Sequence, residues 1–162
     1  MEVDGKAILV ESTPTIDTGA YASGDQLGSL MTLEHALDGS SQTGVLMSVT
    51  IVDGDSQNAP IDVLFFNSQP SIVSTDNASL DISDNDMATK FLGAVSFGAS
   101  DYKGLANNSY ATLRTVGLFI QSSIKRADNV TGAKIFAILQ SRGAPTYTGA
   151  DKLTLKVGIL QD

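Results

Sequence analysis

Two oxygen-rich stretches hold the side chains of this sequence that are best suited to bind a cation. The first is Asp53-Gly54-Asp55, and the second lies within residues 76–86, which contain four aspartates. Calcium takes six to eight oxygen ligands, so both stretches are candidates. Neither has the fixed glycine and terminal glutamate of an EF-hand loop. Because Asp and Asn are also ordinary turn formers, we interpret both stretches as turns and calcium binding as the alternative.

His35 is the candidate for acid–base chemistry, with Glu34 or Asp38 as a partner. The sequence holds one histidine and no cysteine, which excludes disulfides, thiolate zinc sites and cysteine nucleophiles. No Gly-x-Ser-x-Gly elbow supplies a nucleophile. The glycines of 93–98 lack the Gly-x-Gly or Gly-Lys spacing that cradles phosphate. We therefore predict that the protein is not an enzyme and uses no cofactor and no metal.

Arginine and lysine side chains could instead bind carboxylates of another protein chain. These basic residues concentrate around Lys125-Arg126. The arginines among them could bind the carboxylate of Asp53 or Asp55 on a neighbouring copy through two parallel hydrogen bonds. The alternative is that these bases lie on solvated loops and strand edges. The residues predicted to contact other subunits are Tyr21, Asp53, Asp55, Arg114, Lys125, Arg126 and Arg142.

The charge of the chain is unevenly distributed. The net charge is −8, which argues against nucleic acid as a partner because phosphate binding depends on Lys and Arg. Residues 1–81 hold twelve acids and one base, whereas residues 82–162 hold six acids and nine bases. Strands from the two halves could interleave and mix these charges. Alternatively, an acidic face of one subunit meets a basic face of the next, which would help orientation.

Apolar residues recur with a period near two, and turn residues punctuate them at intervals of about 8–12 positions. This pattern is typical of a sandwich or barrel of short strands. We predict a single all-β domain with one short helix at 84–90, capped by Ser83. The predicted strands are 6–10, 27–35, 44–52, 61–66, 92–97, 111–120, 134–140 and 153–160.

Alternation within the strands predicts which side chains are buried. In 44–52, four apolar residues share one face: Val45, Met47, Val49 and Ile51. Strand 61–66 has Asp62 as its only polar residue and is predicted to be covered on both faces. Gly117 indicates a bulge or bend. The six phenylalanines are predicted to be core residues, and the four tyrosines either seal loops or anchor an interface.

The segment before residue 25 differs from the rest. Pro14 fixes its own backbone and biases Thr13 away from helix, so we expect an extended N-terminal segment at 1–24 ahead of a β-sandwich domain at 25–162. This segment could be an arm that adds a strand to a neighbouring chain. It could equally contain the ordinary first strand of the same sandwich.

The start of the chain does not resemble a transport signal. Met1-Glu2-Val3-Asp4 is acidic where a signal peptide is basic. No apolar stretch reaches the roughly 20 residues that span a bilayer. We expect synthesis in the cytoplasm and no contact with a membrane.

Several stretches resemble small structural proteins in the virions of tailed bacteriophages. They are Tyr21-Ala22-Ser23-Gly24-Asp25-Gln26-Leu27-Gly28, Val95-Ser96-Phe97 with Asp101-Tyr102, Ala144-Pro145-Thr146-Tyr147 and the closing strand 153–160 with Gln161-Asp162. The resemblance implies a capsid decoration or cement protein with a jelly-roll-like β-sandwich and no catalytic residues. It also implies a homo-oligomer, a trimer, that binds the major capsid protein on the capsid exterior after synthesis in the host.

Other functions remain open at this point. The chain could be a tail, neck or head-fibre component of the virion, which the copy number per particle would distinguish from a decoration protein. It could also be a carbohydrate-binding adhesion module. Sugar sites usually present exposed aromatic side chains, whereas the sequence holds no tryptophan and its phenylalanines are predicted to be buried.

Overall fold

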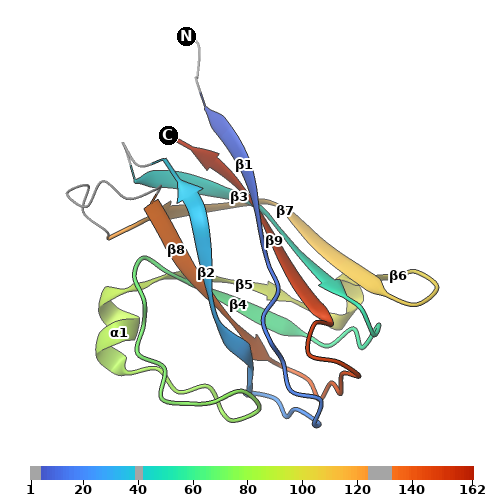
Figure 1. Ribbon diagram of the computed structural model, residues 1–162. Coiled ribbons are helices and arrows are strands. Elements are labelled where there is room, and N and C mark those ends of the chain that lie inside the picture. Colours follow the sequence, from blue (N-terminus) through green and yellow to red (C-terminus); the bar gives the residue numbers. More distant parts are fainter. Residues whose placement is uncertain (1–4, 39–41, 124–132) are drawn as a thin grey trace.

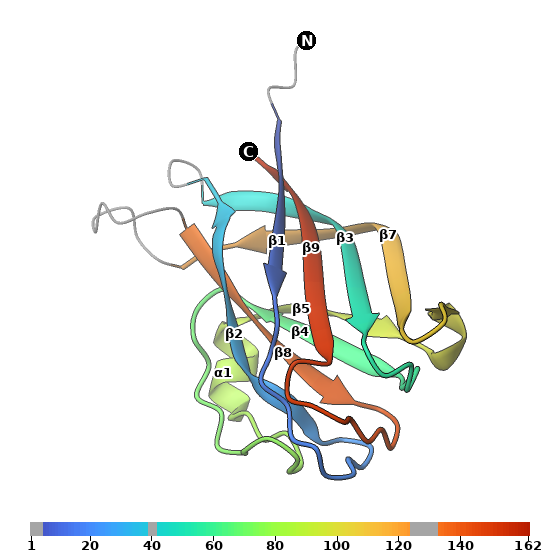
Figure 2. The ribbon, with the colours of Figure 1, turned by 45° about the vertical axis from the view of Figure 1, so that its right-hand side comes forward.

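The computed structural model describes residues 5–38, 42–123 and 133–162. Two antiparallel sheets face each other and enclose the core (Figures 1 and 2). One sheet has the strand order β1-β9-β3-β7-β6, formed by β1 (Lys6–Ser12), β9 (Leu153–Gln161), β3 (Thr43–Asp53), β7 (Ser109–Gln121) and β6 (Lys103–Gly104). The other has the order β2-β8-β4-β5, formed by β2 (Gln26–Leu37), β8 (Ala133–Ser141), β4 (Ile61–Phe66) and β5 (Phe91–Phe97).

This strand order is that of a jelly roll. The first strand pairs with the last, from Lys6 opposite Gln161 to Ser12 opposite Leu155, and the second strand pairs with β8. The chain crosses from one sheet to the other at most of its connections, whereas β4–β5 and β6–β7 are hairpins within one sheet, as in two nested Greek keys. The prediction of an all-β, jelly-roll-like sandwich is confirmed. The short helix is also confirmed as α1 (Asp84–Thr89), and a 3₁₀ turn, η1 (Ala99–Asp101), precedes β6.

The core lies between the sheets and follows the predicted alternation. In β9, every second residue from Leu153 to Ile159 is buried. In β4, Ile61, Val63 and Phe65 enter this core. Burial of such side chains contributes on the order of 1.5–3 kcal/mol each, so the core can hold the fold without staples.

A second apolar layer covers the outer face of the β2-β8-β4-β5 sheet. Here Leu64 and Phe66 of β4, with two residues of β8, pack against the segment 67–91 that leads from β4 through α1 into β5. The apolar residues of this segment in the layer are Ile72, Leu80, Ile82, Met87 and Phe91. Strand β4 is therefore covered on both faces, as predicted. Figure 1 shows the loop and α1 outside this sheet.

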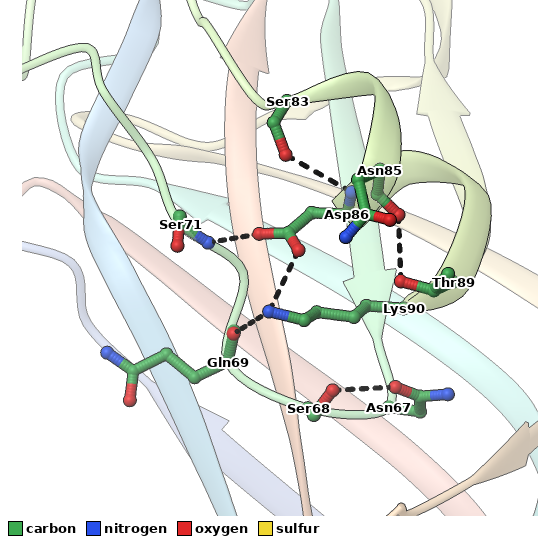
Figure 3. Close-up of polar contacts among 9 residues, drawn as sticks. All are labelled: Asn67, Ser68, Gln69, Ser71, Ser83, Asn85, Asp86, Thr89 and Lys90. Atoms are coloured by element: carbon green, nitrogen blue, oxygen red, sulfur yellow. Dashed lines mark hydrogen bonds and ion pairs between the residues drawn. The ribbon is translucent and has the colours of Figure 1, made fainter.

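Polar contacts fasten this covering segment (Figure 3). The Ser83 hydroxyl accepts a hydrogen bond from the backbone N–H of Asp86 at 3.2 Å, which is the predicted helix cap. The Asp86 carboxylate accepts a 2.6 Å bond from the Ser71 N–H and lies 2.9 Å from Lys90 Nζ. Lys90 Nζ in turn donates to the Gln69 carbonyl at 3.0 Å. Both ends of the segment are thus joined through one buried carboxylate.

A bulge in β3 and β7 changes which side chains face outward. Leu46 pairs with Leu118, but Ser48 pairs with Arg114, so β7 carries extra residues there, among them Gly117 with φ 67°. The predicted bulge is confirmed. The predicted face of β3 is wrong: Val49 and Ile51 are buried, whereas Val45 is half-buried and Met47 is exposed, because the bulge reverses the alternation.

The segment 1–24 contains a strand that pairs within its own chain. Residues 6–12 form β1, which lies at the edge of its sheet beside β9. Ile8 and Val10 pack against the core, whereas Leu9 points outward and is 62% exposed. The edge of β1 that faces away from β9 is where another strand could pair with it.

Candidate protein-interaction surface

One end of the sandwich is built from three loops, 13–25, 54–60 and 142–152, that bond to each other. The Ile16 N–H donates to the Ala150 carbonyl at 3.1 Å, and the Tyr21 N–H to the Pro145 carbonyl at 3.0 Å. The Thr146 N–H donates to Gln57 Oε1 at 3.1 Å. In Figure 1 these loops lie at the lower end. Three predicted contact residues, Tyr21, Asp53 and Asp55, meet here.

Tyr21 is a core residue of this loop end. Its side chain is 2% exposed, and its ring meets that of Tyr147 edge-on at a centroid distance of 6.3 Å. Its hydroxyl donates to Asp76 Oδ1 at 2.7 Å and accepts from the Asp17 N–H at 2.7 Å. Burial, followed by the hydrogen bond to Asp76, raises the pKa of Tyr21. The Tyr21 side chain thus joins loop 13–25 to Asp76 and to Tyr147 of loop 142–152.

Asp53 ends β3 and organises the turn that follows. It is 1% exposed, and its carboxylate accepts hydrogen bonds from the N–H groups of Asp55 (3.0 Å) and Asn58 (2.9 Å). Burial nevertheless raises the pKa of Asp53, because desolvation outweighs these bonds. Its charge also opposes ionisation of Tyr102 and Tyr147 nearby, whose pKa values are raised mainly by burial.

Asp55 ties two loops together. Its carboxylate accepts from the Thr148 N–H at 2.6 Å and from the Thr148 hydroxyl at 3.0 Å, and Lys152 Nζ lies 3.8 Å away. The Thr148 N–H is the main cause that lowers the pKa of Asp55. Asp53 and Asp55 are therefore only two positions apart but have pKa values shifted in opposite directions, and both are bonded within the chain.

Of the two predicted basic contact residues that the structure describes, Arg114 belongs to β7 of one sheet and Arg142 directly follows β8 of the other. Arg142 pairs with Asp62 of the same chain, with Nε 2.6 Å from Oδ2. Arg114 lies on the opposite sheet, is exposed and forms no ion pair with another described residue. Lys125 and Arg126 lie outside the described residues. A contact of these seven residues with another subunit stays a prediction.

The outward side of β1, β9, β3 and β7, here named the bare face, contrasts with the covered sheet. No described segment packs over it, as the two ribbon views show (Figures 1 and 2). The strand register aligns its side chains in rows across the four strands. The first row is apolar throughout and consists of Ala7, Leu160, Val45 and Phe119. The second row is Leu9, Gly158, Ser48 and Arg114.

Exposed apolar surface concentrates on the bare face. Six large apolar side chains are exposed among the described residues, and four of them belong to this face. Phe119 is 80% exposed, Leu9 62%, and Met47 and Tyr110 41% each. The prediction that Phe119 is a core residue is therefore wrong. By alternation, Phe119 would share the buried face of Ala111, eight positions earlier in the same strand. The bulge lies between the two residues and turns Phe119 to the other face.

The bare face also carries few charges. Glu11 and Lys156 pair across β1 and β9, with Nζ 2.9 Å from the carboxylate. Thr50 and Thr112 join the same row, and their hydroxyls are 2.9 Å apart. Arg114 is a positive charge in the row next to the apolar one, and it pairs with no carboxylate in the described part of the chain. In a chain of net charge −8, this face thus has one wholly apolar row, and its charged residues Glu11, Lys156 and Arg114 give no acidic surplus.

Neither a metal-binding cluster nor a spanning helix is found in the described ranges 5–38, 42–123 and 133–162. No three histidine or carboxylate side chains there are grouped to hold a metal ion. No helix there is long and apolar enough to cross a membrane. His35 is an exposed residue of β2 with φ 57°. Its backbone carbonyl accepts a hydrogen bond from Gln161 Nε2 at 2.9 Å.

The chain matches no protein-family model and no curated protein. It is similar to several solved structures from virus particles. The structure of tomato aspermy virus shares 12% identity over 99% of this chain and 78% of that one, with a TM-score of 0.39. For Desmodium yellow mottle tymovirus the identity is 12%, the coverages are 99% and 84%, and the TM-score is 0.27.

A third structure, a heated full particle of Israeli acute paralysis virus, shows 9% identity over 98% of this chain and 68% of that chain, with a TM-score of 0.30. At these low scores the fold assignment rests on the strand order of this chain itself. The class that this order defines is the eight-stranded jelly roll with one small added strand, β6.

Proposed function

We propose that this protein is a structural component of a virus particle that acts by binding other protein chains. The observation that carries the proposal is the asymmetry of the sandwich. Segment 67–91 covers one outer face with apolar side chains, whereas the other outer face presents Phe119, Leu9 and Met47 to solvent. Contiguous exposed apolar surface of this kind marks interaction sites on soluble proteins.

The jelly roll is a suitable scaffold for this role. Two packed sheets form a rigid block whose contact residues are set by strand register, and viral capsid domains are among the proteins built in this way. Fold alone does not imply function, so the bare face carries the argument. The proposed mechanism is bridging, in which each copy buries this face across a boundary between neighbouring chains.

Within this class we favour a decoration or cement protein on the exterior of the capsid, with the major capsid protein and copies of itself as partners. The resemblance to phage virion proteins supports this choice. A protein that binds only the assembled shell stabilises it by mass action. A tail, neck or head-fibre component would use the same surface chemistry at a different place.

Quantitative mass spectrometry of purified particles tests the proposal. We expect the protein in the particles at hundreds of copies, as a shell-covering component requires. About a dozen copies would instead indicate the neck or tail. Absence from particles that are otherwise complete would contradict a structural role altogether.

A second candidate, carbohydrate binding, is favoured by one observation. Phe119 and Tyr110 are exposed aromatic side chains on the same strand, β7, and lectin domains also use jelly rolls. A glycan array probed with the purified protein separates the two functions. Binding that is lost in Phe119→Ser would support the adhesion role.

A further inference from the structure

We propose that the bare face packs against the bare face of a second copy of this chain, around a two-fold axis parallel to its strands. This inference names the partner of the surface and rests on the proposed function in one respect, namely that the surface is a protein contact. The order of residues within each row is complementary to the same row of a second copy.

A two-fold axis parallel to the strands reverses the strand order. It places β1 of one copy over β7 of the other and β9 over β3, while each row stays opposite itself. In the first row, Phe119 then faces Ala7 of the second copy, and Leu160 faces Val45. The largest side chain of the row meets the smallest, which is the shape match that packed sheets need to interdigitate.

The second row adds charge complementarity. Arg114 on β7 comes to lie over Leu9 on β1 of the second copy, and Glu11 lies two residues further along that strand. Two residues of a strand span about 6.8 Å, which the long arginine side chain can cover. The same contact occurs twice, because the axis repeats it. Arg114 forms no ion pair with another described residue, and Glu11 is shared with exposed Lys156.

The available area sets the strength of this contact. Four strands at about 4.8 Å spacing and seven residues at about 3.4 Å rise give a projected face of roughly 450 Å² per copy. Together the two copies then bury about 900 Å² in projection, which is at the low end for a specific contact. We therefore expect a weak pair in dilute solution, with a dissociation constant on the order of 10–100 μM, that is strengthened where many copies are held together.

Sedimentation equilibrium of the full chain between about 5 μM and about 1 mM tests the pairing in the range where a contact of this size is half-formed. We expect reversible dimers, and Phe119→Ser should raise the dissociation constant at least tenfold. Phe119 is 80% exposed, so this substitution leaves the core intact, and an unchanged melting temperature verifies that. Val73→Ser is the matched control, because Val73 is 74% exposed but lies in the segment that covers the other sheet, and it should change nothing.

Charge reversal tests the two-fold geometry. Arg114→Glu and Glu11→Arg should each dimerise at least fivefold more weakly than the wild type. Mixed in equal amounts, the two variants should form heterodimers in preference to either homodimer, since both ion pairs are then restored. The double variant should dimerise like the wild type. Equal behaviour of mixed and separate variants would overturn the two-fold arrangement.

The failures of this inference and of the proposed function can be told apart. A chain that stays monomeric at 1 mM overturns self-pairing. If Phe119→Ser then also fails to enter particles, the face contacts a different chain and the structural role stands. If the protein is absent from particles but binds glycans through Phe119, both proposals fail.

Discussion

At the scale of single residues, the two neighbouring tyrosines of the loop end offer a matched comparison. Tyr21 and Tyr147 are both buried and touch edge-on, but the Tyr21 hydroxyl makes two hydrogen bonds and the Tyr147 hydroxyl makes none with a described residue. Tyr21→Phe should lower the free energy of unfolding by about 1–3 kcal/mol, because a bond to a carboxylate is lost. Tyr147→Phe should stay within about 1 kcal/mol of the wild type or exceed it.

Urea unfolding of the two variants measures the difference. Equal losses in both variants would contradict the assignment of Tyr21 as the residue that fastens loop 13–25. Binding to particles should be unaffected by Tyr147→Phe, since its ring and its packing remain.

Gly28 allows a second prediction at this scale. Its φ is 76°, and a Cβ there would lie 2.8 Å from Pro14 Cβ and 2.9 Å from the Thr15 carbonyl oxygen. Its N–H donates to Asp76 Oδ1, the acceptor that Tyr21 also uses. Gly28→Ala should therefore cost about 1–3 kcal/mol of stability, measured by thermal unfolding. Gly104→Ala is the control, because a Cβ there meets nothing within 4 Å, and it should cost less.

At the scale of elements, α1 and its loop should respond to acid through Asp86. The Ser71 N–H, followed by Lys90, lowers the pKa of Asp86. A group whose pKa is lowered by folding contributes stability above its ordinary pKa and loses it as the pH falls through the folded pKa. Below about pH 4, segment 67–91 should therefore loosen from its sheet.

Hydrogen exchange of the Ser71 and Asp86 amides follows this loosening. Asp86→Asn should show the faster exchange already at pH 7, because the ion pair with Lys90 is gone. Asp84→Asn changes a carboxylate in the same first turn that does not bind Lys90, so it should exchange like the wild type. Faster exchange in Asp84→Asn alone would contradict the role of Asp86.

The elements also show what a sequence can and cannot predict. The covered strand β4, the Ser83 cap and the bulge at Gly117 were predictable because each depends on neighbouring residues. The loop contacts were not. Asp55 and Thr148 are 93 positions apart, and nothing in either segment indicates the other.

The candidate surface was predictable only in part, for a related reason. Arg114 was expected to be available to a partner and is exposed without an ion pair among the described residues. The apolar row with Phe119 was missed, since an alternating strand has two faces and the pattern does not say which one meets the core. That choice depends on the bulge and on the register of three other strands.

At the scale of the whole molecule, buried phenols should make the fold sensitive to alkali. Burial raises the pKa values of Tyr21, Tyr102 and Tyr147 above the ordinary value near 10. Above about pH 10 the unfolded chain loses protons that the folded chain keeps, so the free energy of unfolding falls as the pH rises. Three such groups give a slope of up to about 4 kcal/mol per pH unit.

Unfolding curves between pH 9 and 12, read by tyrosine absorbance and circular dichroism together, check this expectation. The three buried phenols should ionise in the same step in which the strands unfold. Ionisation of all tyrosines with intact circular dichroism would contradict their burial.

The pairing of the first strand with the last has a consequence for synthesis on the ribosome. Among the described strands, β1 pairs with β9 alone and β2 with β8 alone, so β1 stays unpaired until β9 has been synthesised and β2 until β8 has been. Until then, the apolar residues of the early strands lack the neighbours against which they pack, and a topology rich in such distant contacts folds slowly. Before their distant partners are made, β1 and β2 are the strands whose apolar side chains and unpaired edges are most open to association with other chains.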